Sequence, residues 1–170
     1  MQLHQTYILE NVYAVSAAKE IAGYNARSEI GHFDQHNADK FTQFVLGIDR
    51  EYGNVLSPSD SLYLLLQYVD EYVWHKETPF GVDAIDLRRI FNRAAMGKMK
   101  YAFDDSREWS IKLEGSYNFE KHDSYIQPAV AWKRGNVEIE VGLDVLGNSE
   151  SFFGGFVENK RGYVKGKYLF

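Results

Sequence analysis

Four side chains could supply the three members of a nucleophilic triad. His122, Asp123 and Ser124 are consecutive, and Glu138 follows at a distance that a hairpin could bridge. A serine activated by a histidine, with a carboxylate orienting the imidazole, would suit a lipid hydrolase. The stretch also resembles a polar turn, where His, Asp and Ser are common for turn formation alone. No oxyanion-hole signature accompanies it, so we assign no catalytic residue and keep hydrolysis as an alternative.

Metal and cofactor sites are not indicated. His32 and His36 have a spacing that binds metal on a helix, but here they flank a strand end with Asp34 between them, and the chain has no cysteine. Gly154 and Gly155 resemble a flexible loop, since no Lys-Ser/Thr pair follows as in a phosphate-binding loop. We therefore expect neither a metal nor a cofactor.

A third set of polar side chains recurs at alternate positions in the later part of the chain. Its members carry both charge signs, and opposite charges on neighbouring strands would pair across a sheet. The mixed signs argue against a strongly anion- or cation-selective surface. The set comprises Lys98, Lys100, Lys112, Glu114, Glu138, Glu140, Asp144, Lys165 and Lys167.

The segments that carry this set alternate between apolar and polar residues. From Trp109 to Phe119 and from Val137 to Val145, every odd-numbered residue is apolar or glycine, and nearly every even-numbered one is polar. From Tyr163 to Phe170 the even positions hold Val, Gly, Tyr and Phe, opposite two lysines. A period of two predicts β-strands with one apolar and one polar side.

Earlier segments alternate less regularly. Phe44–Ile48 does so apart from Val45, Leu62–Trp74 is apolar at nearly every position to Tyr68, and Tyr7–Val15 and Ala22–Phe33 alternate loosely. With the later segments they give about nine strands. The predicted fold is all-β: an antiparallel up-and-down (meander) β-barrel or partial barrel of about 8–10 strands, of the transmembrane type.

Two places disturb this pattern. The stretch Asp86–Met96 has apolar residues at helical spacing with a plausible N-cap, yet from about Ile90 onward it also reads as a strand, which we favour. Pro128 lies inside a predicted strand, where it cannot donate a ladder hydrogen bond. We expect it to mark a bulge or the end of that strand.

Composition agrees with a β-protein and excludes several classes. The chain has 170 residues, enough for one domain, and aromatic residues make up 15% of it. The chain has no run of about 18 apolar residues, which a membrane-spanning helix would need. The net charge of -5 is spread along the chain without a basic stripe, so we expect no nucleic-acid partner.

Alternation alone does not say whether the apolar face encloses a core or meets lipid. Longer connections (Gly147–Lys160 and His75–Arg88) alternate with short ones (Arg134–Asn136 and Asp104–Arg107) in the C-terminal half, as in outer-membrane barrels. Aromatic residues near strand ends would suit the two bilayer interfaces: Trp109, Phe119, Trp132, Phe103, Tyr72 and Trp74. The alternative is a soluble β-barrel that binds an apolar ligand inside.

The span from about Phe41 to Phe170 resembles the C-terminal portion of a porin-like outer-membrane family of Gram-negative bacteria. The resemblance lies in FTQFVLGIDREYG, SLYLLLQYVDEYVW, RRIFNRAAMGKMKYAF, WSIKLEGSYNF and the closing GYVKGKYLF. It implies a location in the cell outer membrane, passive transport of small solutes and no catalytic residue. It also implies recognition by the barrel-assembly machinery through the C-terminal strand ending at Phe170.

Several expectations follow from this resemblance. The charged set on the polar faces would line the pore, lipid of the outer membrane would contact the apolar faces, and a homo-oligomer is possible. An outer-membrane lipid hydrolase is the less favoured alternative. An odd strand count and the absence of a visible signal peptide suggest that residues 1–170 form a single β-barrel domain that is the C-terminal part of a larger barrel.

Overall fold

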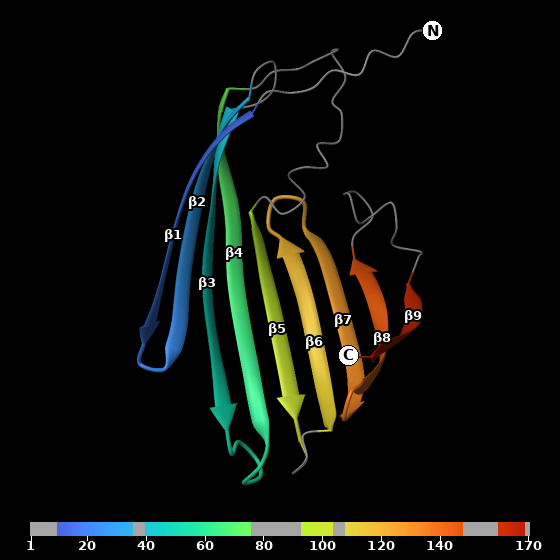
Figure 1. The fold of residues 1–170 in the computed structure, drawn as a ribbon. Coiled ribbons are helices and arrows are strands. Elements are labelled where there is room, and N and C mark those ends of the chain that lie inside the picture. The colour runs from blue at the N-terminus through green and yellow to red at the C-terminus, as the bar shows by residue number, and fades with distance from the viewer. Residues whose placement is uncertain (1–9, 36–39, 76–92, 104–107, 148–159, 169–170) are drawn as a thin grey trace, which may run out of the picture.

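The chain folds into one antiparallel sheet of nine strands. The structure is a computed structural model, and it describes residues 10–35, 40–75, 93–103, 108–147 and 160–168 (Figure 1). The strands are β1 (Glu10–Ile21), β2 (Tyr24–Gln35), β3 (Lys40–Gly53), β4 (Ser61–His75), β5 (Ala94–Ala102), β6 (Trp109–Asn118), β7 (Asp123–Arg134), β8 (Val137–Gly147) and β9 (Arg161–Tyr168). No helix among the described residues could cross a bilayer.

Each strand pairs only with its neighbours in the chain, so the sheet is a simple meander. Two tight turns set its first and seventh hairpins. Ala22 and Gly23 both have positive φ, as a type I′ turn requires, and Gly135 alone has positive φ in the Gly135–Asn136 turn, as type II′ expects. These turns and residues 54–60 lie at one end of the sheet, which we call the short-turn end (Figure 1). Strands β4 and β8 end, and β5 and β9 begin, at the opposite end of the sheet.

The predicted all-β meander of about nine strands is confirmed at this level. The sheet is open, because β1 and β9 pair with no second neighbour in the described part of the chain. Since nine strands alternate in direction, β1 and β9 run the same way (Figure 1). An antiparallel ladder between these two strands is therefore not available for closure.

The two irregular segments have different outcomes. The strand predicted from about Ile90 begins at Ala94, while most of the competing helical stretch, residues 86–92, lies outside the described residues. The prediction that Pro128 marks a bulge or strand end was wrong. Strand β7 continues through Pro128, which pairs with Leu113 on β6. Only the ladder to β8 is interrupted there, because the N–H that proline lacks would face β8. The register between β7 and β8 is the same on both sides of this gap.

The two faces of the sheet differ in chemistry and in exposure. We call the face that carries Glu20, Asp49, Lys98, Lys112 and Glu140 the polar face. The opposite, apolar face carries Val15, Leu46, Leu66, Leu113 and Val141, which are 66%, 51%, 57%, 40% and 54% exposed. In the described part of the chain the buried hydrophobic residues are small, apart from one valine: Val69, Ala94, Ala102, Ala129 and Ala131. The usual arrangement of a water-soluble protein is thus inverted, with carboxylates covered and large apolar side chains exposed.

Candidate functional site

The strand register places all nine predicted charged residues on the polar face. Residues directly opposite one another in an antiparallel ladder share a face. One continuous rung runs from Glu20 through Asn25, Asp49, Leu65, Lys98 and Glu114 to Gln127. A second set of pairs joins Glu138 to Lys167, Glu140 to Lys165 and Asp144 to Arg161. The polar face is therefore continuous from β1 to β9.

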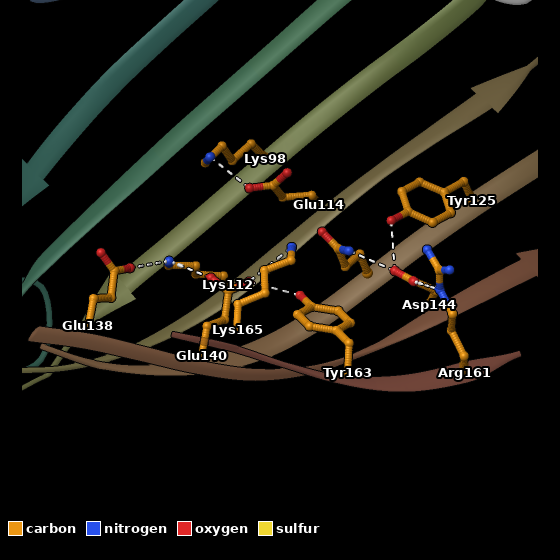
Figure 2. Close-up of polar contacts among 11 residues, drawn as sticks. Lys98, Lys112, Glu114, Tyr125, Glu138, Glu140, Asp144, Arg161, Tyr163 and Lys165 are labelled. Atoms are coloured by element: carbon orange, nitrogen blue, oxygen red, sulfur yellow. Dashed lines mark hydrogen bonds and ion pairs between the residues drawn. The ribbon is translucent and has the colours of Figure 1, made fainter. Parts of the chain in front are cut away.

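Lys112 on β6 binds two carboxylates on β8, across the intervening strand. Its Nζ lies 3.0 Å from Glu138 Oε1 and 2.6 Å from Glu140 Oε2. Strand β7 contributes Ala129 opposite Lys112 and Ala131 opposite Glu140, and both alanines are buried. A reach over two strand spacings requires small residues beneath it and a sheet that curves toward the polar side. In Figure 2 the side chains of β8 indeed point across this bend toward β6.

Glu140 also interacts with two side chains of β9. The Tyr163 hydroxyl donates to Glu140 Oε1 at 2.9 Å, and Lys165 Nζ lies 3.5 Å from the same oxygen. Tyr163 can lie flat on the sheet because its cross-strand partner is Gly142. A Cβ at Gly142 would meet the Tyr163 ring at 2.6 Å and the Pro128 carbonyl at 2.8 Å. The glycine thus makes room for the ring that completes the Glu140 site.

Asp144 is the centre of a neighbouring cluster. It accepts hydrogen bonds from Tyr125 Oη at 2.9 Å and Gln127 Nε2 at 2.6 Å on β7, and from Arg161 Nε at 2.6 Å on β9 (Figure 2). Its side chain is 8% exposed, so these donors replace the water that a carboxylate would otherwise need. Only Asp144 was predicted. Tyr125, Gln127 and Arg161 were missed, although they also stand at alternate positions on the polar side of their strands.

The remaining predicted residues are more exposed. Lys98 Nζ lies 2.7 Å from Glu114 Oε1, and both side chains are more than one-third exposed. Lys100 lies opposite Lys112, and Lys167 lies opposite Glu138. Neither Lys100 nor Lys167 has a hydrogen bond or ion pair within the described ranges, and each is exposed to solvent. Lys100 and Lys167 attract the Glu138 carboxylate without forming an ion pair with it, so the cluster contains both closely paired charges and exposed ones.

A second buried carboxylate lies on the same face near β1. Asp49 on β3 accepts a hydrogen bond from Asn25 Nδ2 at 3.1 Å and forms an ion pair with Arg27, both on β2. Asp49 directly follows the alternating segment Phe44–Ile48, and its two partners on β2 were not predicted. The loose alternation of Ala22–Phe33 concealed the two donors, which are the polar-face residues of β2 next to the first turn.

The candidate triad is not brought together. Ser124 pairs with Tyr117 on the apolar face and lies opposite Gly147, whereas Glu138 lies on the polar face beside Lys133. Glu138 and Gly147 are separated by most of β8, roughly 30 Å at the rise of a strand. The His122 Nδ1 atom lies 3.1 Å from the Tyr117 hydroxyl. These positions supply no arrangement in which His122 could take a proton from Ser124 while Glu138 orients the imidazole.

Metal-binding chemistry has no cluster to support it in the described ranges. No group of three or more His, Cys, Asp or Glu side chains there is placed to hold an ion. His32 Nδ1 lies 2.9 Å from Thr42 Oγ1 on β3. Its proposed companion His36, and the glycines Gly154 and Gly155, lie outside the described residues.

A fully buried carboxylate organises the connection between β3 and β4. Asp60 accepts hydrogen bonds from the backbone N–H groups of Val55, Leu56 and Ser57 at 2.6 to 2.9 Å, and from the Tyr101 hydroxyl at 2.6 Å. Burial alone would raise the pKa of Asp60. The four donors outweigh that effect and lower the pKa to about 2. Asp60 therefore stays ionised at neutral pH and fixes this turn against β5.

The apolar face is banded along the strand direction. Four of its charged residues in the described β1–β9 lie close to strand ends (Lys19, Asp34, Arg50 and Arg134), whereas Asp70 lies inside β4, five residues before its end. Aromatic pairs also lie near the ends. Trp109 and Trp132 have ring centroids 6.5 Å apart at the short-turn end, and Tyr72 and Trp74 are 4.7 Å apart at the opposite end. The guanidinium of Arg50 lies 4.6 and 4.7 Å from the ring centroids of Tyr24 and Tyr52.

Comparison with known proteins assigns no relative. No protein-family model, curated protein or solved structure matches the chain. The two faces of the sheet are therefore the features of this chain from which a function can be inferred.

Proposed function

We propose that this chain is the wall of an outer-membrane β-barrel with porin-like passive transport of small solutes. In this proposal the apolar face contacts lipid and the polar face lines a water-filled passage. The observation that carries the proposal is the inverted pattern of exposure. Large apolar side chains such as Val141 and Leu66 are exposed, while Asp144 and Asp49 are covered by donors.

Strand length and banding support the same proposal. About 9–11 residues of tilted strand cross a bilayer. Strands β6 and β8 have 10 and 11 residues. Aromatic and charged residues near the strand ends would meet the polar interfaces, and the apolar middle would meet the hydrocarbon. Closing a passage by pairing β1 with β9 would need a parallel ladder, since the two strands run the same way, and that closure is part of the proposal.

The experiment compares two neighbouring positions that face opposite ways. Val164 is 73% exposed on the apolar face, and the Lys165 side chain is 61% exposed on the polar face. The chain has no cysteine, so Val164→Cys and Lys165→Cys can be labelled without background. After refolding into phospholipid vesicles, a water-soluble maleimide should react with Lys165→Cys and react far more slowly with Val164→Cys. Denatured samples should react equally.

Equal labelling at both positions in vesicles would contradict the proposal. A detergent-free, folded monomer in which Val164→Cys is protected would instead favour the alternative of a soluble barrel enclosing an apolar ligand. That alternative needs the apolar face on the inside. The two functions therefore differ in the condition that protects Val164→Cys: lipid vesicles for the membrane barrel, and detergent-free solution for the soluble barrel.

A further inference from the structure

Some exposed charged side chains on the polar face belong to no ion pair in the described part of the chain, and the acidic ones lie on different strands from the basic ones. On β1, β2 and β3, Glu20, Glu29 and Glu51 are exposed and have no hydrogen bond or ion pair within the described residues. On β5, β7 and β9 the same is true of Lys100, Lys133 and Lys167. Three acids therefore remain on one part of the face and three lysines on the other.

The register confirms that these six side chains share one face. Glu51 pairs with Tyr63 on β4, and Tyr63 pairs with Lys100 on β5. Glu20 belongs to the rung that includes Lys98, and Glu29 lies opposite Val45. Lys133 and Lys167 flank Glu138 on either side. Since the Glu138 carboxylate is already bound by Lys112, those two lysines remain in excess.

Five of the six lie near the short-turn end. Glu20 and Glu51 are close to the ends of β1 and β3, where the chain enters the turns. Lys100, Lys133 and Lys167 are close to the ends of β5, β7 and β9, which run in the same direction. Strand β4 separates the acids from the lysines and contributes the uncharged Tyr63 at their level.

We propose that this divided face favours small zwitterionic solutes over uncharged ones of the same size. The proposal rests on the proposed function, since it concerns solutes in the passage. A solute with an ammonium and a carboxylate group can orient its dipole between the two sets of charges. An uncharged solute gains nothing from them. Fixed charges in a confined site attract solutes most strongly at low ionic strength, because screening is then weak.

The test uses two isomers, β-alanine as the zwitterion and lactamide as the uncharged solute. The full chain is reconstituted into phospholipid vesicles at low salt, and swelling rates are corrected for protein-free vesicles. The measured quantity is the swelling rate with β-alanine divided by the swelling rate with lactamide. We expect this ratio to be about three-fold or more higher for the native chain than for two variants that lack one set of charges. The variants are the triple Lys100→Gln, Lys133→Gln, Lys167→Gln and the triple Glu20→Gln, Glu29→Gln, Glu51→Gln. Lys160→Gln, outside the strands, is the matched control and should keep the ratio.

The outcomes separate the two proposals. Loss of the preference in both triple variants, with lactamide entry retained, supports the inference. Entry of both isomers with a ratio that neither triple variant changes overturns the inference and leaves the passage intact. If neither isomer enters vesicles that contain folded protein, the proposed transport function itself is overturned.

Discussion

Lys112 Nζ and Glu140 Oε2 lie 2.6 Å apart although an entire strand separates the residues that carry them. The contact crosses Ala129 and Ala131 on β7, and it draws β6 and β8 together on the polar side. Because their side chains are only 16% and 15% exposed, this pair is better shielded than the others on the face. We regard it as a contact that holds the curvature of the sheet.

A double-mutant cycle measures this contact. Lys112→Met combined with Glu140→Gln should show a coupling energy of about 1–2 kcal/mol, measured by denaturant unfolding in micelles. The exposed pair Lys98 and Glu114 is the control, with an expected coupling of about 0–0.5 kcal/mol from the same measurement. Equal coupling in the two cycles would show that Lys112 has no special structural role.

Gly142→Ala should destabilise the sheet because the new methyl group collides with Tyr163 and with the Pro128 carbonyl. The expected loss is about 1–3 kcal/mol in the free energy of unfolding. Gly166→Ala is the matched control, since nothing lies within 4 Å of a Cβ at that position. Adding Tyr163→Ala should restore part of the loss, and the backbone contact should keep the rest.

The Asp60 turn predicts a dependence on acid. The folded-state pKa of about 2 lies below the unfolded value of about 3.9. The stabilisation by Asp60 is therefore fully present above pH 4 and is lost as the pH falls from about 4 to about 2. The thermal midpoint should drop over this window in the native chain and much less in Asp60→Asn, which should be less stable at pH 7. Tyr101→Phe removes one donor only and should weaken the dependence partially.

The three tryptophans can test the proposed lipid contact without labelling. Trp74, Trp109 and Trp132 are on the apolar face near strand ends, and Trp74 donates to Thr42 Oγ1 at 2.8 Å. In vesicles, lipids brominated near the headgroup should quench their fluorescence more strongly than lipids brominated near the chain terminus. Quenching by aqueous iodide as complete as in denatured protein would contradict burial of this face in lipid.

The sequence was sufficient to predict the strands wherever alternation was strict. Trp109–Phe119 gave β6 (Trp109–Asn118) almost residue for residue, because a period of two has no other compact explanation. Pro128 was misjudged because proline removes only one donor, and the N–H that it lacks faces β8 while the pairing to β6 continues. A single sequence does not specify which neighbour a strand residue faces.

The polar contacts were predictable as a face but not as pairs. Alternation placed Lys112 and Glu140 on the same side, yet their contact depends on curvature and on two alanines in a third strand. From the sequence, Tyr163 is an ordinary aromatic residue of a strand. Its contact with Glu140 depends on Gly142 as its cross-strand partner, which only the register reveals. Polar residues at alternate positions in the first half of β2, in the first half of β7 and along β9 were the available signal for the partners that were missed.

A sheet in which every strand pairs only with its sequence neighbours also constrains how the chain can fold. Each new hairpin finds its template in the strand just made, so loop closure remains local and the contact order of each step is low. Assembly can progress hairpin by hairpin along the chain, and only the joining of β1 to another strand requires a distant segment. Insertion or loss of a whole hairpin would preserve the direction of every strand, which makes the two-strand unit the natural increment by which such a sheet changes size.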